Sequence, residues 1–315
     1  NLYYTAPQVE LAERLIATAF SARVFLCNSG AEANECAIKL ARKWGRRHRH
    51  GAIGIVALKG GFHGRTMGAL AATAQARYRQ PFEPLPSGFQ HVDADIESIG
   101  AAVGDDVAAV LLEPIQGESG VQILSRELLA AAREACDEHG AALVFDEVQC
   151  GMGRTGSLWA YEQLGVRPDA MTVAKALGGG LPIGALVTGE RLADVLAPGD
   201  HGSTFAGGPV IAAAALAALE LTDDPQLLER VRELGRKLAD GAARLAHVRA
   251  VRGRGLMLAC DLDVSARAVV ERALFDQRLV LNATGPDTLR LLPPLIIEEA
   301  DIEDALARLA RALEG

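Results

Sequence analysis

Short apolar runs alternate with amphipathic stretches along the first part of the chain. Such runs are typical of the inner strands of a parallel sheet, whereas apolar residues that recur every three or four positions are typical of helices. On this basis we predict extended segments at residues 23–27, 53–58, 107–112 and 142–145, and helices at residues 7–19, 31–46 and 126–139. This alternating order predicts an α/β fold built on a doubly wound, mostly parallel sheet.

The pattern changes after a long Ala-rich helix that we predict for residues 210–221. Thr222-Asp223-Asp224-Pro225 follows it, and the next predicted helix is richer in charge. We therefore predict a large domain over residues 1–222 and a smaller α+β domain over residues 223–315. The smaller domain continues with a segment at 248–262 that contains Gly253 and Gly255, and after it we predict a helix at 265–276, strands near Leu279 and Leu289, and a last helix at 300–313.

Composition and charge exclude several classes of protein. Half of the 315 residues are hydrophobic, which is enough for a packed core. The 32 basic and 40 acidic residues give a formal net charge of -8, and the longest basic run, residues 42–49, is typical of the solvated end of a helix. We therefore expect neither a nucleic acid nor an anionic membrane as a partner.

The cysteines and the chain start bear on the cellular compartment. The five cysteines have scattered spacings that fit neither a disulfide framework nor a zinc site. They are Cys27, Cys36, Cys136, Cys150 and Cys260. The sequence has no apolar run of about eighteen residues and no secretion signal, so we expect a cytoplasmic protein with reduced thiols. The chain begins with Asn1 rather than Met, and we expect a further segment upstream.

Two opposite charges end two of the apolar runs. Asp146 follows residues 142–145, and Lys175 follows residues 170–174. In an α/β fold the carboxyl ends of the parallel strands border the crevice that binds ligands, so both side chains are expected there. Burial would lower the pKa of a lysine from about 10.4 and make its neutral amine a nucleophile. A structural ion pair is the alternative interpretation of these two residues.

Two Gly-containing segments follow predicted strands. Residues 28–34 place small side chains where a helix begins, which favours either a phosphate cradle made of backbone N–H groups or an ordinary Ser cap. Residues 151–156 match the G-x-G-x-x-G pattern of dinucleotide sites. Residues 147–150 separate that pattern from the strand, so we predict a Gly-rich loop and keep a dinucleotide-dependent oxidoreductase as an alternative from another class.

Two further segments offer polar groups after predicted strands. Residues 62–65 combine an aromatic ring, an imidazole and a guanidinium, and a guanidinium matches the two oxygens of a carboxylate. Residues 113–118 offer two carboxylates. Either segment by itself could also be a solvated surface loop. The sequence has no phosphate-binding loop of the G-x-x-x-x-G-K-[ST] type, no G-x-S-x-G elbow and no H-E-x-x-H motif, so we predict neither a hydrolase nor a metal site.

Six segments, taken in order, resemble the class III aminotransferases that use pyridoxal phosphate. They are residues 28–34, 62–66, 112–120, 146–156, 174–180 and 201–205. The resemblance extends from Asn1 to the carboxyl terminus. It implies fold type I, in which a large doubly wound domain and a small domain assemble as a homodimer with shared active sites.

The resemblance also implies a reaction. Four segments, residues 1–4, 27–34, 62–66 and 201–205, are most similar to the members of this class that act in arginine biosynthesis. Those enzymes move the terminal amino group of N2-acetyl-L-ornithine to 2-oxoglutarate. The products are N-acetyl-L-glutamate 5-semialdehyde and L-glutamate. Succinylornithine, ornithine, N-acetyllysine-type and 4-aminobutyrate donors are alternatives within the class.

The matched positions carry the family's cofactor roles residue by residue. Lys175 would hold the cofactor covalently and move a proton, and Asp146 would pair with the pyridine nitrogen. Val148 and Phe62 would pack on the two faces of the ring. The other implied contacts are Gly30 and Ala31 to the phosphate, Gln149 near the ring hydroxyl, Glu147 within the same set, and Thr204 to the phosphate of the neighbouring subunit.

The same resemblance assigns the substrate contacts. Arg65 would bind a substrate carboxylate and Ser203 would help to place the acylated amino acid. In related ornithine aminotransferases, a Glu at the position of Glu118 masks an Arg at the position of Arg290 until 2-oxoglutarate binds, and we expect the same switch here.

Two departures from the family pattern affect these expectations. Residues 206–209 read Ala-Gly-Gly-Pro, where the family usually has Gly-Gly-Asn-Pro. Family members also carry a segment before the position of Asn1 that supplies part of the substrate pocket and of the small domain. A shortened, inactive fold is therefore a further alternative to the enzyme.

Overall fold

The computed structural model describes residues 3–20 and 22–315, and the chain divides into two compact units. The first unit comprises Asn1–Pro114, Leu124–Gly151 and Trp159–Leu221, and the second comprises Ile115–Ile123, Met152–Leu158 and Thr222–Gly315. The predicted large domain, residues 1–222, thus includes two segments that belong to the second compact unit. The division at residue 222 into two independent domains stays a prediction.

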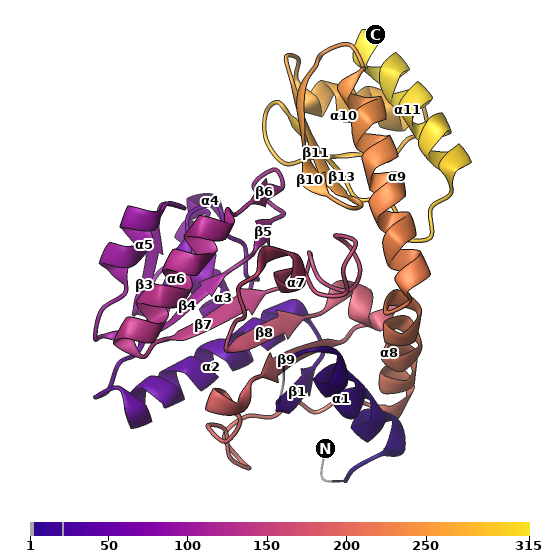
Figure 1. Cartoon of the computed structure of the whole chain (residues 1–315). Coiled ribbons are helices and arrows are strands. Elements are labelled where there is room, and N and C mark those ends of the chain that lie inside the picture. The colour runs from indigo at the N-terminus through magenta and orange to yellow at the C-terminus, as the bar shows by residue number, and fades with distance from the viewer. Residues whose placement is uncertain (1–2, 21) are drawn as a thin grey trace. The chain divides into compact units, whose positions relative to one another are not determined.

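The first unit is built on a sheet whose order, in the described part of the chain, is β1-β9-β8-β7-β4-β2-β3 (Figure 1). The strands are β1 (Arg23–Cys27), β2 (Gly54–Leu58), β3 (Phe89–Val92), β4 (Val107–Leu112), β7 (Ala142–Asp146), β8 (Ala170–Val173) and β9 (Gly184–Thr188). Pairing is parallel from β8 to β3, and β9 is antiparallel to both of its neighbours. This confirms the predicted α/β class with a mostly parallel sheet.

Helices cover both faces of this sheet. They are α1 (Ala6–Thr18), α2 (Gly30–His48), α3 (Met67–Ala72), α4 (Ala76–Arg79), α5 (Ile96–Ala102), α6 (Arg126–His139), α7 (Tyr161–Leu164) and α8 (Pro209–Thr222), with short 3-10 turns at Gln80–Phe82, Lys175–Gly178 and Glu190–Leu192. Alternate residues of the strands face opposite sides. Leu143 and Phe145 of β7 join the core with α5 and α6, whereas Ala142 and Val144 join the core with α2.

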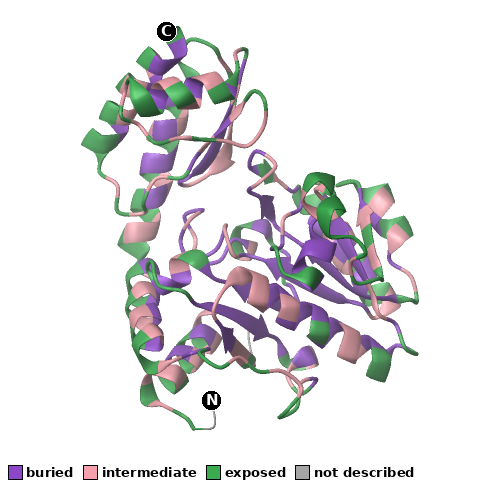
Figure 2. Ribbon diagram, turned by 180° about the vertical axis from the view of Figure 1, so that it is seen from behind, coloured by how far each residue is buried: buried purple, intermediate pink, exposed green. Residues whose placement is uncertain are grey.

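Burial on both faces explains why the inner strands are apolar at nearly every position. In Figure 2 these strands are coloured as buried. Residues of β4 and β7 are buried throughout. Polar side chains therefore stand mainly after the strands, where the loops begin, and it is there that the chain places the residues considered below.

The second unit has a separate antiparallel sheet with the order β10-β11-β13-β12 and a two-stranded β5-β6 hairpin. The elements are β5 (Ile115–Gln116), β6 (Gln122–Ile123), β10 (Val248–Arg254), β11 (Met257–Leu262), β12 (Asn282–Ala283), β13 (Thr288–Leu291), α9 (Pro225–Ala243), α10 (Ala266–Phe275) and α11 (Glu299–Glu314). Residues 248–262 form the hairpin of β10 and β11. The chain reverses at residues 255–256, where Gly255 has φ of 52°, a left-handed conformation that Gly adopts readily.

Two absences concern the described residues alone. None of the helices at residues 3–20 and 22–315 combines the length and the apolarity that crossing a membrane requires. Over the same ranges, no group of three or more His, Cys, Asp and Glu side chains is arranged to hold a metal ion.

Candidate active site

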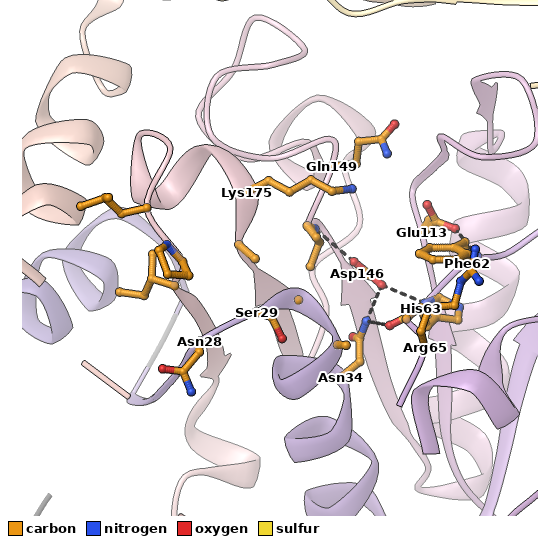
Figure 3. A pocket seen from close by; sticks show the side chains of 18 of the residues that line it. Asn28, Ser29, Asn34, Phe62, His63, Arg65, Glu113, Asp146, Gln149 and Lys175 are labelled. Atoms are coloured by element: carbon orange, nitrogen blue, oxygen red, sulfur yellow. Dashed lines mark hydrogen bonds and ion pairs between the residues drawn. The ribbon is translucent and has the colours of Figure 1, made fainter. Parts of the chain in front are cut away.

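A cavity of about 610 Å³ lies within the first unit (Figure 3). Its walls come from the loops that follow β1, β2, β4, β7 and β8, so it lies at the carboxyl ends of the strands, where open α/β sheets bind ligands. The sequence-predicted residues that line it are Gly30, Ala31, Phe62, Arg65, Asp146, Val148, Gln149 and Lys175. The fold thus brings together side chains from five separate loops.

Asp146 ends β7 on the cavity floor, and three donors fix its carboxylate. Asn34 Nδ2 and His63 Nδ1 lie 2.7 and 2.8 Å from Oδ2, and the Val148 N–H donates to Oδ1 over 3.1 Å. Figure 3 shows Asn34 and His63 converging on this carboxylate. Charge-assisted hydrogen bonds of this kind hold an acceptor in one orientation. Asp146 is therefore a fixed negative charge beneath the cavity.

A buried layer supports the donors in turn. Asn34 also donates to the carbonyl of His63 over 2.7 Å and accepts from Thr172 Oγ1 over 2.9 Å. The His63 N–H donates to Thr73 Oγ1 over 2.9 Å. Because these residues come from α2, β8 and the loop after β2, the layer joins three elements around one carboxylate.

The charge of Asp146 also affects its histidine partner. Burial by itself lowers the pKa of His63, but the hydrogen bond that His63 donates to Asp146, the charge of Asp146 and that of Glu113 outweigh burial and raise the pKa. His63 is thus favoured in its cationic form, which balances the buried carboxylate. Sequence reasoning noted the imidazole of residues 62–65 but assigned His63 no role, and it assigned none to Asn34. Asn34 and His63 are far from Asp146 along the chain, so no local sequence pattern indicates this cluster.

Lys175 follows β8 and enters the same cavity. The structure corrects the expectation that this lysine is buried, because its side chain is exposed in the single chain. Its backbone has φ 44°, a left-handed conformation that is uncommon for residues other than Gly and is found at functional sites. Among the described residues, Lys175 makes no ion pair with Asp146. The structural ion pair considered from the sequence is therefore excluded in this structure.

The start of α2 forms an anion site beside Lys175. Ser29 caps the helix, with its Oγ accepting the Glu32 N–H over 3.2 Å. The N–H groups of Gly30 and Ala31 have no acceptor among the described residues, as is general for the first turn of a helix. Val148 lies so close that a Cβ on Gly30 would meet its Cγ1 at 2.7 Å. A larger residue than Gly would close this cradle.

The donor set fits pyridoxal phosphate. Free backbone N–H groups at a helix N-terminus suit a phosphate, a fixed carboxylate suits a protonated ring nitrogen, and an amine stands in the same cavity for the aldehyde carbon. Val148 and Phe62 line the cavity as apolar walls. The Phe62 N–H donates to Glu113 Oε1 over 2.8 Å, which holds that wall in place.

Glu147, which was predicted among the cofactor contacts, lies outside the cavity. Its fully buried carboxylate accepts the N–H groups of Ala160 and Tyr161 over 2.6 and 2.8 Å. Burial raises the pKa of Glu147 to about 8, against the lowering effect of these two donors. The signal was in the sequence, because consecutive residues of an extended chain point to opposite sides, so Asp146 and Glu147 cannot both face the cavity.

The other predicted contacts lie outside this cavity. Ser203 Oγ accepts from Asn28 Nδ2 over 2.7 Å, and Asn28 lines the cavity. Thr204 is exposed on the loop that precedes α8. Within the second unit, Arg290 Nη1 lies 2.6 Å from Glu118 Oε1 and donates to the Gly117 carbonyl over 3.0 Å.

We expect a His63→Ala variant to lower kcat/KM by about 10- to 100-fold, because a hydrogen bond to a charged group contributes about 1.5–3 kcal/mol. His63→Asn is the matched control, since it can return a neutral donor near the position of Nδ1. A His63→Ala enzyme with unchanged kinetics would refute the positioning role.

The same pair of variants has a pH signature. A histidine whose folded pKa is raised contributes stability that is fully present below its unfolded pKa of about 6.5 and is lost as pH rises through the folded pKa. The difference in free energy of unfolding between wild type and His63→Asn should therefore shrink as pH rises from below about 6.5 through the raised pKa of folded His63. Denaturant unfolding at several pH values measures it.

Comparison with known proteins identifies the family. The family model described as Aminotransferase class-III matches residues 1–313. A mitochondrial acetylornithine aminotransferase from Alnus glutinosa is 48% identical over 323 residues, which covers 99% of this chain and 72% of that protein. The crystal structure of an N-acetylornithine aminotransferase from Stenotrophomonas maltophilia K279a matches with 40% identity and a TM-score of 0.85, over 100% of this chain and 81% of that chain.

A second solved structure bears on the cofactor. An ornithine aminotransferase from Toxoplasma gondii, crystallized in the presence of oxidized glutathione, matches with a TM-score of 0.92 and 31% identity. The match covers 99% of this chain and 77% of that chain, and that protein shows partial occupancy of pyridoxal phosphate at its active site. These similarities confirm the predicted fold type I architecture and imply the same cofactor for the family.

Proposed function

Because the chain belongs to the class III aminotransferases, we propose that it moves the terminal amino group of N2-acetyl-L-ornithine to 2-oxoglutarate. The similar proteins named acetylornithine aminotransferase support this donor. The observation that carries the proposal is the single cavity that holds the fixed Asp146 carboxylate, the Lys175 amine and the free N–H groups of Gly30 and Ala31. These groups serve the ring nitrogen, the aldehyde and the phosphate of one cofactor.

The proposed cofactor contacts follow from the cavity walls. When bound, pyridoxal phosphate supplies an electron sink for the negative charge that develops as a proton leaves the substrate carbon. Asp146, oriented by Asn34 and His63, keeps the ring nitrogen protonated. Val148 and Phe62 restrict the ring to one plane, and Gln149 lines the cavity where a ring substituent would lie.

Lys175 performs the proton transfer in this proposal. Its Nζ would remove a proton from the terminal carbon of the donor substrate and would deliver it to C4′ of the bound cofactor, as a positioned general base and acid. The exposed side chain has the freedom that two such positions require. Arg65, on the cavity wall, binds the donor carboxylate, and Ser203 contributes to the site of the acylated amine.

The Glu118 and Arg290 pair is proposed as the switch between the two substrates. The 2.6 Å ion pair supports the idea that Glu118 neutralises Arg290 while the donor, which has a neutral amide and an aliphatic stem, is bound. Release of Arg290 would provide a second carboxylate clamp for the dicarboxylate 2-oxoglutarate.

We expect Arg290→Ala to raise the KM for 2-oxoglutarate by about 10- to 100-fold, because this is the effect of losing one hydrogen bond between charged groups. The half-reaction with the amino donor should change by less than about threefold, because in this proposal Arg290 stays paired with Glu118 while that donor is bound. Rapid mixing of each half-reaction measures the two effects. Glu118→Gln is the control, and it should lower the KM for 2-oxoglutarate. An unchanged 2-oxoglutarate half-reaction in Arg290→Ala would remove the switch from the mechanism.

We further propose that the enzyme works as a homodimer in which Thr204 reaches the cofactor phosphate of the neighbouring subunit. Thr204 and Phe205 are exposed on one loop, and Phe205 has 80% of its surface accessible. Tyr3 and Tyr4, which border a surface cavity with Ser203, are 84% and 90% exposed. Aromatic residues of this kind are enriched at interfaces. Sedimentation equilibrium of the holoenzyme tests the dimer.

A panel of amino donors tests the function. N2-acetyl-L-ornithine, succinylornithine, ornithine and 4-aminobutyrate are each offered with 2-oxoglutarate, and kcat/KM is compared. We expect the acetylated donor to have the highest value. A holoenzyme that turns over another donor best would replace the proposed substrate, and one that lacks the visible absorbance of a lysine-bound cofactor, abolished by borohydride, would remove the whole reaction class.

A further inference from the structure

Arg65 is held in the cavity wall by aromatic rings rather than by an acid. Its Cζ lies 3.7 Å from the centroid of the Tyr78 ring and 5.4 Å from that of Phe62. The two rings meet edge to face, with centroids 6.0 Å apart and an interplanar angle of 80°. Over the described residues, the guanidinium of Arg65 has no hydrogen bond or ion pair.

An aromatic partner leaves the donors of a guanidinium available. The ring lies against the flat face of the group, whereas the N–H bonds that match a carboxylate lie in its plane. An acidic partner would occupy those same donors and cancel the charge. The stacked arrangement therefore restrains a long side chain, which otherwise loses about 2 kcal/mol of rotamer entropy on binding, and it does so without neutralising it.

Tyr78 is itself fixed from outside the cavity. It belongs to α4, its N–H donates to the Gln75 carbonyl over 3.0 Å, and its hydroxyl accepts from Arg77 Nη2 over 2.9 Å. The Cζ of Arg77 lies 4.6 Å from the centroid of the same ring. Tyr78 is half-buried and does not line the cavity. Any effect of Tyr78 on a ligand must therefore pass through Arg65 or Phe62.

We propose that Tyr78 is a positioning residue that sets the affinity of the cavity for carboxylates by holding the Arg65 guanidinium flat and its in-plane donors free. The inference deepens the proposed function, since it rests on Arg65 as the carboxylate site. The ring of Tyr78, 13 positions after Arg65 in the sequence, is thus part of the carboxylate site although it does not touch the ligand.

The test compares Tyr78→Leu with Tyr78→Phe in the holoenzyme. Because Tyr78→Leu removes the cation–π contact with Arg65, we expect it to raise the KM of the amino donor by about 3- to 10-fold while kcat stays within about twofold. Tyr78→Phe retains the ring, so it should keep the wild-type KM. Tyr78→Met serves as a second non-aromatic variant if Tyr78→Leu does not fold, and thermal unfolding checks each protein.

A binding measurement separates the inference from the proposed reaction. Glutarate is a dicarboxylate that cannot react, and its dissociation constant from the holoenzyme, measured by calorimetry, should rise by the same about 3- to 10-fold in Tyr78→Leu. This result would uphold the inference even if N2-acetyl-L-ornithine were not a substrate. If the wild-type enzyme transaminates the donor but the Tyr78→Leu variant binds glutarate as tightly as wild type does, the inference is overturned and the proposed function stands.

A double-mutant cycle distinguishes positioning from general support of the loop. In an Arg65→Ala background, Tyr78→Leu should have no further effect on glutarate binding, because the guanidinium that it holds is gone. An equal effect in both backgrounds would show that the ring supports the loop alone, and would overturn the inference. Phe20→Leu is the matched control: it removes a comparable ring beneath Arg167, 5.3 Å from the guanidinium carbon and outside the cavity, and should leave glutarate binding unchanged.

Discussion

A Lys175→Ala holoenzyme is expected to lose transamination by at least about 10³-fold, because a positioned proton-transfer group alone contributes about 10²–10⁴-fold. Lys175 also provides the amine that would hold the cofactor covalently, so the loss adds to the effect on proton transfer. Lys175 is the lysine that lines the cavity in the described chain, and it does so from the short turn Lys175–Gly178 that follows β8.

Two measurements check this result. Steady-state and single-turnover kinetics give the rate, and borohydride reduction followed by peptide mapping should find the cofactor on the peptide that contains residue 175 in wild type and on none in the variant. Lys59→Ala is the control, since Lys59 is an exposed partner of Asp93 and surface ion pairs contribute only about 0–1 kcal/mol. Normal turnover by the Lys175→Ala protein would end the mechanism proposed here.

The second-largest effect is expected from Asp146→Asn, which should lower kcat/KM by about 10²–10³-fold, the range for loss of one preorganised electrostatic group. The substitution removes the negative charge that keeps the ring nitrogen protonated. It also places an amide among the donors of Asn34, His63 and Val148, where one N–H group would face another. Both changes act on the bound cofactor rather than on substrate capture.

The measurement therefore combines kinetics with cofactor affinity. We expect weaker retention of pyridoxal phosphate on dialysis and a lower kcat for Asp146→Asn. Asp169→Asn is the matched control, because Asp169 is also held by several groups, Arg133, Arg191 and the Leu143 N–H, yet it does not line the cavity. It should lower the stability by about 1–3 kcal/mol and leave kcat unchanged. Equal kinetic losses in the two variants would contradict a special role for Asp146.

Local signals explain which elements of the fold could be predicted. The strand at 107–112 and the helix at 126–139 have the predicted bounds. The strand is buried on both faces, which requires a continuous apolar run. The helix begins after Ser125, whose Oγ accepts the Leu128 N–H over 3.1 Å, and ends at Gly140 with φ 68°. Caps of this kind are properties of a few neighbouring residues.

Other elements needed information from outside their own residues. We made no prediction for β3 or β9. β3 is an edge strand of mixed polarity, so it lacks the continuous apolar run of an inner strand. β9 pairs antiparallel with both β1 and β8, and that arrangement is known only once its neighbours in the sheet are known. From the sequence, the hairpin of β10 and β11 is one segment with two glycines inside it, because a turn at Gly255 is distinguished from a bulge or a strand glycine only by which residues pair.

The sequence by itself determined that Asp146 and Lys175 each follow an apolar run, that a helix begins near Ala31, and that these motifs belong to one family. Such features are local, since they depend on the order and type of adjacent residues. Only the tertiary structure decided that Asn34 and His63, 112 and 83 positions away along the chain, both meet the carboxylate of Asp146. It also decided that Lys175 is exposed in the single chain rather than buried, and that Tyr78 lies over Arg65. Each of these depends on which strands and loops are neighbours in space, and strand order and packing are set by the burial of the whole core, not by any single segment.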